Sequence, residues 1–230
     1  MEDPEIIVPS NPIKNLLNGD CSERAAELCL WGMGLDNAKA KTVNNISYYI
    51  RSSDALDLLS NQMISCFIID YFLLHVSQLC PEFGVIGSNA SKSMLLGNYN
   101  YLRHMIPQKN KLFIPIHWSL STPVVSIIDG NHWLLAYVDI IKQEAKIYDS
   151  LAVFPHSLRN PIHQLLQEIS PAKWKITLEN SPKQIGIVDC GLFLMLFAAC
   201  IANDIKLELI NNKKCEIYRN NIAQFISERY

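Results

Sequence analysis

The sequence of 230 residues lacks the features that mark several protein classes. Its seven cysteines are odd in number and include no C-x-x-C pair, which argues against a zinc knuckle and against a disulfide framework. Lysine and arginine (20) do not outnumber aspartate and glutamate (22), so no basic field favours nucleic acid as a partner. The longest apolar run, from Leu192 to Ala202, is too short to span a bilayer.

A secretory signal pattern is also missing. The first residues carry acids where a signal peptide needs basic residues followed by an apolar core. We therefore expect a reducing, intracellular compartment, cytoplasmic or nuclear, in which the thiols stay free. We expect a monomer that needs no cofactor and no metal, and that binds neither nucleic acid nor a membrane. At least one cysteine of such a protein then needs another explanation.

The composition is that of a folded protein, because hydrophobic residues make up 49% of the chain. We expect one domain over residues 51–230, preceded over residues 1–50 by an N-terminal extension whose role the pattern does not define. Prolines punctuate the start of this extension, and a short helix is expected over residues 21–35.

Hydrophobic periodicity predicts helices that flank a central group of strands. One helix is expected from Asp54 through Val76, whereas residues 88–110 have no clear pattern. Short apolar or alternating runs indicate strands, and longer apolar faces indicate helices. The expected strands are 111–117, 132–139, 143–149 and 174–178, and the expected later helices are 155–169, 190–202 and 216–228. This order favours the α+β class with a mixed sheet.

Cys190 is the best placed of the seven thiols to act as a nucleophile. It ends a loop that begins at Gln184, and it starts the apolar helix expected over residues 190–202. The positive end of a helix dipole stabilises a thiolate, and the first N–H groups of a helix have no partner within it and can serve as donors. The alternative is a buried structural cysteine that begins a core helix.

His132 is the candidate base, because a hairpin over residues 132–149 brings an acid to it. With a turn centred between Ile140 and Ile141, His132 lies opposite Asp149, and directly opposite Cβ atoms are roughly 4.5–5.5 Å apart. The alternative is a strand-end histidine that only forms hydrogen bonds. The same register gathers on one face the apolar residues Leu134, Ala136, Ala145 and Ile147.

Two competitors for the base and its acid are weaker. Asp139 lies at an odd spacing from His132, so on a straight strand it points to the other face of the sheet. A second His-Trp pair, His117-Trp118, has Asp129 as its next acid, but Asp129 lies in a loop and no hairpin aligns the two.

Together these pieces resemble the ubiquitin-like-protein proteases, the sentrin-specific (SUMO) proteases and their relatives, which share a papain-like core with the adenoviral protease. The resemblance covers roughly residues 55 to 205. It favours His132 over His117, since His117 matches a strand-end histidine of the family that is not the base. The residues that carry it are, in order, Phe113 to His117, His132-Trp133-x-Leu135, Asp149-Ser150, Gln184 and Asp189-Cys190-Gly191.

The resemblance implies a role for each site residue of a cysteine protease. Cys190 would be the nucleophile, His132 the general base and acid, and Asp149 the group that orients the imidazole. Gln184 would donate its side-chain amide to the oxyanion, beside the backbone N–H of Cys190. Trp133 would wall the channel that admits the Gly-Gly tail of a ubiquitin-like modifier; the alternative for Trp133 is packing at a strand end.

The sequence departs from the family pattern just before the first long helix. The family has Trp-Leu-Asn-Asp there, and its Trp closes the other side of the channel, whereas this chain has Leu59-Ser60-Asn61-Gln62. Leu59 and Asn61 are the substrate-binding candidates of this segment. Because the Trp is missing, SUMO, ubiquitin and related modifiers all stay open as the partner.

Two other functions also stay open. An acetyltransferase effector of the same clan uses a similar order of His, acid and Cys, and a non-catalytic module could bind a modifier with the same fold. The His-Trp pair and the aspartate favour a protease over the first, and the complete set of site residues favours an enzyme over the second. We expect a deubiquitinase or ubiquitin-like-protein isopeptidase that acts through a thioester.

Overall fold

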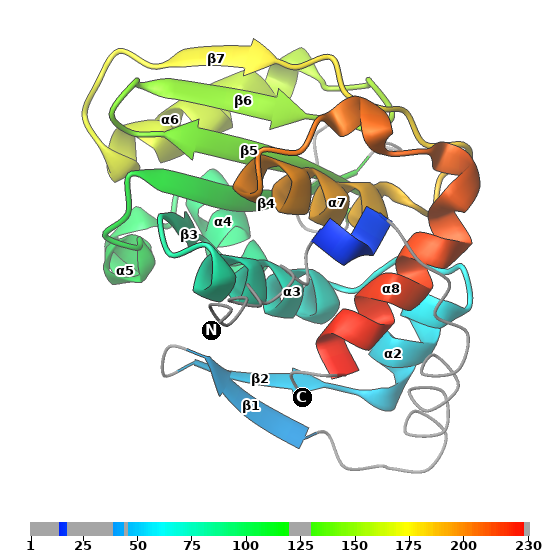
Figure 1. Cartoon of the computed structure of the whole chain (residues 1–230). Helices are drawn as coiled ribbons and strands as arrows, with labels where there is room; N and C mark the ends of the chain where they lie inside the picture. Colours follow the sequence, from blue (N-terminus) through cyan, green and yellow to red (C-terminus); the bar gives the residue numbers. More distant parts are fainter. Residues whose placement is uncertain (1–13, 18–38, 44–45, 120–129, 228–230) are drawn as a thin grey trace, which may run out of the picture.

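The centre of the fold is a mixed five-stranded sheet of order β3-β4-β5-β6-β7 (Figure 1). The computed structural model describes residues 14–17, 39–43, 46–119 and 130–227. The strands are antiparallel from β4 to β6, and each edge strand is parallel to its neighbour. Their bounds are β3 (Phe83–Val85), β4 (Lys111–Trp118), β5 (His132–Asp139), β6 (Glu144–Tyr148) and β7 (Lys175–Leu178).

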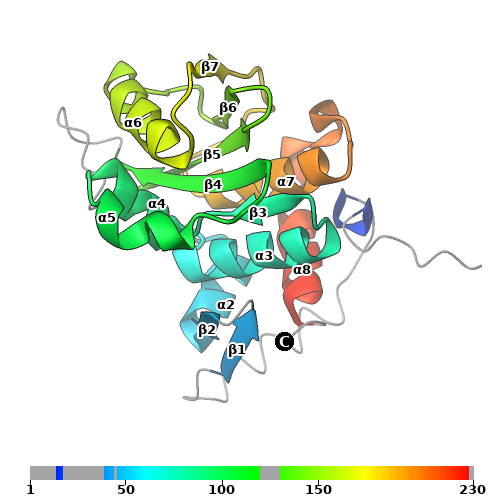
Figure 2. The ribbon, with the colours of Figure 1, turned by 90° about the vertical axis from the view of Figure 1, so that its left-hand side faces the viewer.

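Helices cover both faces of this sheet (Figure 2). On one face lie α3 (Cys66–Leu79) and α7 (Cys190–Ala202), with α2 (Ser52–Leu59) and α8 (Cys215–Ser227) beside them. On the other face lie α4 (Ser88–Leu95) and α6 (Arg159–Ile169). The remaining elements are η1 (Lys14–Leu17), β1 (Lys39–Val43), β2 (Ile46–Ile50), α5 (Tyr99–Leu102), η2 (Arg103–Met105), η3 (His156–Leu158), η4 (Leu207–Leu209) and η5 (Asn212–Lys214).

Alternation along β5 sends its side chains into two separate cores. Leu134 and Ala136 pack with α4 and α6, whereas Trp133 and Leu135 pack with α3 and α7. Helix α7 is buried from Cys190 onward, because the sheet, α3 and α8 all contact it. A helix covered in this way needs no polar face, which explains its apolar sequence. In the described ranges, no helix combines the length and the apolar character that a membrane crossing requires.

The expected strands and later helices are confirmed, and so is the α+β class with a mixed sheet. The single helix expected from Asp54 through Val76 is wrong, because the chain forms α2 and α3 with residues 60–65 between them. Asn61 has a φ of 55°, in the left-handed region, which no continuous helix accommodates. The sequence pattern did not predict β1, β2, β3 and α4.

The hairpin of β5 and β6 differs from the expected register by two residues. Asp139 pairs with Glu144, so the loop spans residues 140–143 instead of two residues. The Asp139 carboxylate accepts the N–H of Lys142 at 3.0 Å, and Gln143 has a φ of 56°; together they close the longer turn. Because the shift is even, every side chain keeps its expected face.

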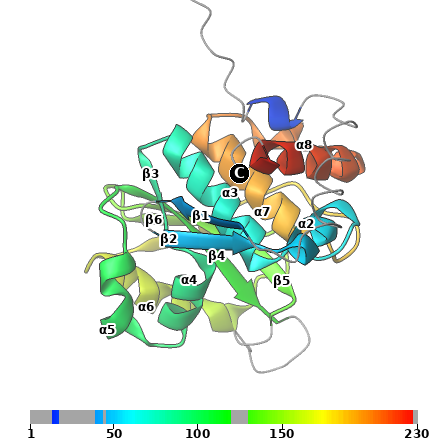
Figure 3. The ribbon, with the colours of Figure 1, turned by 90° about the horizontal axis from the view of Figure 1, so that it is seen from below.

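Two described parts of the N-terminal extension pack on the domain. Leu16 in η1 is buried, and its carbonyl accepts a hydrogen bond of 2.9 Å from the Asn221 side chain in α8. Ile50 at the end of β2 is buried in the same core as α3 and α7. The β1–β2 hairpin forms a small separate sheet (Figure 3). The helix expected over residues 21–35 lies outside the described residues, and the division at residue 50 stays a prediction.

Candidate active site

The ends of three elements carry the predicted catalytic side chains. His132 is the first residue of β5, Asp149 directly follows β6, and Cys190 is the first residue of α7. Since β5 and β6 are antiparallel, the start of one lies beside the end of the other. All three side chains are buried, with 1% or less of their surface exposed. The site therefore lies within the protein core rather than on a surface loop.

Asp149 is held as a carboxylate by three hydrogen bonds. Its Oδ1 lies 2.8 Å from His132 Nε2 and accepts the backbone N–H of Leu151 at 2.9 Å. Its Oδ2 accepts the backbone N–H of Val153 at 2.9 Å. Ala152, with a φ of 56°, turns the chain so that both N–H groups point back. Burial alone would raise the pKa of Asp149, but His132 and these N–H groups hold it below its usual value.

The second ring nitrogen of His132 is available to the thiol. Nε2 is engaged by Asp149, and Nδ1 is buried with no hydrogen-bond partner among the described atoms. Burial lowers the pKa of His132, but the hydrogen bond with Asp149 and the nearby Cys190 outweigh the effect of burial and raise the pKa to about 9. The arrangement thus favours an imidazolium between a carboxylate and a sulfur, which is what transfer of the thiol proton requires.

The other described cysteines are also free thiols, but their surroundings differ. Burial raises the pKa of Cys66 and of Cys80, that of Cys200 to about 12 and that of Cys215 to about 11. These four groups stay protonated at neutral pH. Cys190 has a different neighbour, the imidazole of His132.

Ser150 orients the side chain of Gln184, a contact that the sequence analysis missed. The Ser150 hydroxyl donates to Gln184 Oε1 at 2.6 Å, and the Gln184 backbone N–H donates to the Ser150 carbonyl at 3.0 Å. Gln184 Nε2 in turn donates to the Gly186 carbonyl at 3.0 Å. A carboxamide nitrogen carries two N–H groups, so this bond leaves the second for another acceptor. No local signal could reveal the contact, because the two residues are 34 positions apart.

Trp133 supports the turn that carries the thiol. Its ring stacks on His117 at a centroid distance of 4.0 Å, and only 3% of its surface is exposed. A Cβ atom at Gly191 would lie 3.5 Å from Trp133 Cδ1 and 3.1 Å from Ile64 Cβ. Gly191 therefore allows the chain next to Cys190 to approach Ile64 closely, while Trp133 lies at an ordinary packing distance, whatever it contributes to substrate binding.

Of the other two substrate-binding candidates, Leu59 is the last residue of α2 and Asn61 lies between α2 and α3. Leu59 packs at the edge of the core that contains Cys190, and Asn61 is exposed. In this segment it is Ile64, which the sequence analysis did not select, that the described contacts place against Gly191. Contact of Leu59 and Asn61 with a substrate stays a prediction.

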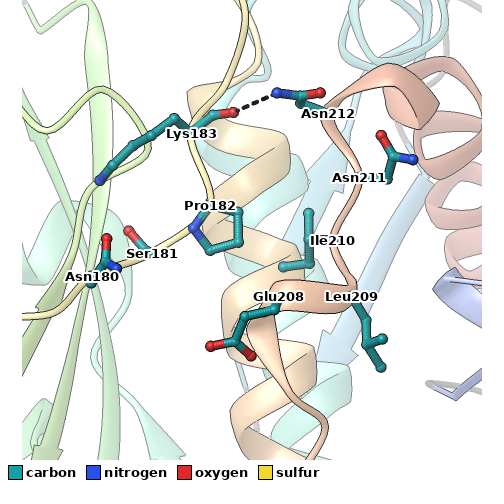
Figure 4. A pocket seen from close by; sticks show the side chains of 9 residues that line it. All are labelled: Asn180, Ser181, Pro182, Lys183, Glu208, Leu209, Ile210, Asn211 and Asn212. Carbon is teal, nitrogen blue, oxygen red and sulfur yellow. Dashed lines mark hydrogen bonds between the residues drawn. The ribbon is translucent and has the colours of Figure 1, made fainter.

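A groove of about 600 Å³ lies beside the segment that leads to Gln184 (Figure 4). Residues 180–183 form one wall and residues 208–212 the other, joined by a hydrogen bond of 3.2 Å from Asn212 Nδ2 to the Lys183 carbonyl. None of the predicted catalytic residues lines this groove, so it is separate from the thiol site. In the part of the chain that the structure describes, no three His, Cys, Asp or Glu side chains are arranged to hold a metal ion.

The two histidines near the site should titrate at opposite ends of the pH scale. We expect ring NMR signals of His132 to report a pKa of about 9 and those of His117 a pKa of about 4. The pKa of His117 is lowered mainly by burial, and further by the charges of Lys92 and His132. Asp149→Asn should lower the pKa of His132, because it removes the hydrogen bond and the charge that raise it.

The same variant should change how stability depends on pH. The folded pKa of His132 lies above the ordinary value of 6.5, so its stabilising contribution is present below pH 6.5 and is lost as the pH rises through about 9. Asp149→Asn should reduce this loss in urea denaturation. An unchanged His132 pKa in the variant would contradict the assignment of Asp149 as its partner.

Comparisons with known proteins place this chain in a family. The model of the Ulp1 protease family, C-terminal catalytic domain, matches residues 93–230. A structure of SUMO protease Ulp1 with its catalytic cysteine oxidized to a sulfinic acid is 18% identical, with a TM-score of 0.72 over 93% of this chain and 98% of that chain.

Two further solved structures share the fold. The C-terminal Ulp1 protease domain in complex with Smt3, the yeast orthologue of SUMO, is 18% identical, with a TM-score of 0.72 over 90% of this chain and 96% of that one. The Ulp1-like SUMO protease catalytic domain of Chaetomium thermophilum is 15% identical, with a TM-score of 0.62 over 92% of this chain and 85% of that one. The chain belongs to the Ulp1 protease family and is a cysteine peptidase with its papain-like α+β fold.

Proposed function

We propose that this chain cleaves the bond after the C-terminal Gly-Gly of a ubiquitin-like modifier, with Cys190, His132 and Asp149 as the catalytic triad. The observation that carries the proposal is the 2.8 Å contact between His132 Nε2 and Asp149 Oδ1, next to a thiol at the start of a buried helix. Family membership supports peptidase chemistry, and the relative solved in complex with Smt3 supports a modifier as the partner.

The near-complete burial of the thiol supports a narrow substrate. Cys190 is 1% exposed, and Ile64 and Trp133 pack closely against Gly191 beside it. A residue with a side chain would need more room at such a site than glycine does. The Gly-Gly tail of SUMO, ubiquitin or a related modifier meets this requirement, with Leu59 at the end of α2 and Asn61 after it as further contacts.

Each side chain then has one task in the reaction. The Cys190 thiol gives its proton to Nδ1 of His132, and the sulfur attacks the glycyl carbonyl. The oxyanion accepts hydrogen bonds from the Cys190 N–H and from Gln184 Nε2. The imidazolium, held by Asp149, returns the proton to the leaving nitrogen, which is a lysine ε-amine or a peptide nitrogen, and a thioester remains.

Hydrolysis of the thioester uses the same groups in a second step. His132 takes a proton from a water molecule, whose oxygen attacks the thioester carbonyl. The modifier leaves as a free carboxylate, and the proton returns to the sulfur of Cys190. Gln184 and the Cys190 N–H stabilise the second oxyanion as they did the first, and the enzyme is restored.

Cys190→Ala should abolish turnover while modifier binding survives. The variant removes the sulfur that forms the thioester and leaves the walls of the site in place. Release of amidomethylcoumarin from modifier conjugates measures turnover, and calorimetry measures binding. Cys200→Ala, in the same helix, is the matched control and should stay active. Turnover by Cys190→Ala would rule out Cys190 as the nucleophile.

Gln184→Ala should lower kcat and leave KM little changed. Loss of one oxyanion donor removes about 3–4 kcal/mol of transition-state stabilisation, which corresponds to a loss of about 10²–10³-fold in kcat. Ser150→Ala should give a smaller loss, because the carboxamide stays but its Oε1 loses the hydroxyl that orients it. If kcat of Gln184→Ala matched that of the wild type, Gln184 would not be an oxyanion donor.

A further inference from the structure

Arg219 in α8 is a buried arginine that the proposed mechanism does not use. Only 2% of its surface is exposed. Its Nε and Nη2 donate to Asp189 Oδ1 at 3.0 and 2.8 Å. Its Nη1 donates to the carbonyl of Leu58 at 2.9 Å, and Nη2 donates to the carbonyl of Gln62 at 2.9 Å. One side chain thus joins the residue before the thiol to the connection between α2 and α3.

The guanidinium group suits this position for two physical reasons. Its donors lie in one rigid plane, so a single group can reach acceptors in several directions. The last carbonyls of α2 have no partner within the helix and carry its negative dipole end, which favours a cation there. Longer contacts, of 3.3 Å to the Asp57 carbonyl and 3.4 Å to the Val188 carbonyl, extend the same set.

The segments that Arg219 joins carry the two sides of the proposed site. Residues 58–62 include Leu59 and Asn61, the candidates for contact with the modifier tail. Asp189 immediately precedes Cys190 at the start of α7. Helix α8 lies beside both α2 and α7, which lets one side chain reach both segments (Figure 3).

We propose that Arg219 is a positioning residue that fixes residues 58–62 relative to the Cys190 turn. The proposal rests on the proposed function, since it assigns the tail-binding side of that site to residues 58–62. Arg219 places a positive charge near Asp189 and donates to the carbonyls of Leu58 and Gln62, and Arg219→Lys separates these two contributions. A lysine keeps a positive charge near Asp189, but its donors sit on one nitrogen and do not reach the Leu58 and Gln62 carbonyls as well.

We expect Arg219→Lys to loosen residues 58–62 while the thiol stays reactive. Hydrogen exchange of their amides should accelerate, and binding of the modifier in a Cys190→Ala background should weaken about tenfold. The rate at which iodoacetamide alkylates Cys190 should change less than about twofold, because the charge near Asp189 is kept. Arg103→Lys is the control, since Arg103 pairs with the Glu168 carboxylate through the same two nitrogens on the surface.

Asp189→Asn changes the other partner of the ion pair, and it tests the same proposal if Arg219→Lys does not fold. It keeps an oxygen acceptor for Arg219 and leaves the carbonyls of Leu58 and Gln62 in place. Exchange should accelerate at residues 188–190 and not at residues 58–62, and modifier binding should stay within about twofold of the wild type.

Three results would overturn the proposal for Arg219. One is unchanged exchange at residues 58–62 in Arg219→Lys. Another is a parallel fall of alkylation, binding and folded fraction in that variant, which marks a general structural role. The third is faster exchange at residues 58–62 in Asp189→Asn. If the wild type bound no modifier, the proposed function would fail, whereas the exchange measurements would still decide whether Arg219 holds the two segments.

Discussion

The hydrogen bond between His132 and Asp149 is the interaction on which the rest of the site depends. Both side chains are completely buried, and an isolated buried charge is costly, so each needs the other to be ionised there. The N–H groups of Leu151 and Val153 donate two further hydrogen bonds to the Asp149 carboxylate. The imidazole is then free to serve the thiol through its second nitrogen. The antiparallel pairing of β5 and β6 brings the two residues together, so the sheet itself orients the imidazole.

Burial also controls access to the thiol. Helix α7 is covered by the sheet and by neighbouring helices, and Gly191 lets Ile64 and Ile69 approach the turn at its start. The proposed Gly-Gly tail, which has no side chains, is compatible with such a site. The contacts of Arg219 add a second constraint, because they join the start of α7 to the segment before α3. Catalytic geometry and substrate access therefore depend on the same packing.

Strand parity and chain order made much of the fold and the site predictable. Alternation placed His132 and the apolar residues of β5 on the correct face, even though the hairpin register was wrong by two residues. The loop length depends on the Asp139 side chain and on the left-handed φ of Gln143, which periodicity does not encode. The break between α2 and α3 escaped detection because Met63 continues across it the helical spacing of Leu59 and Phe67. Arg219 was missed because its acceptors lie far along the chain; Gln62 is 157 positions away.

Covalent capture by modifiers that carry a C-terminal electrophile tests the central claim most directly. SUMO, ubiquitin and related modifiers would each be incubated with the full chain, and the adducts mapped by mass spectrometry. The account predicts one modifier per chain on Cys190, no adduct in Cys190→Ala and a much slower reaction in His132→Ala. The absence of an adduct with every modifier, or an adduct on Cys66 or Cys215 instead, would contradict it.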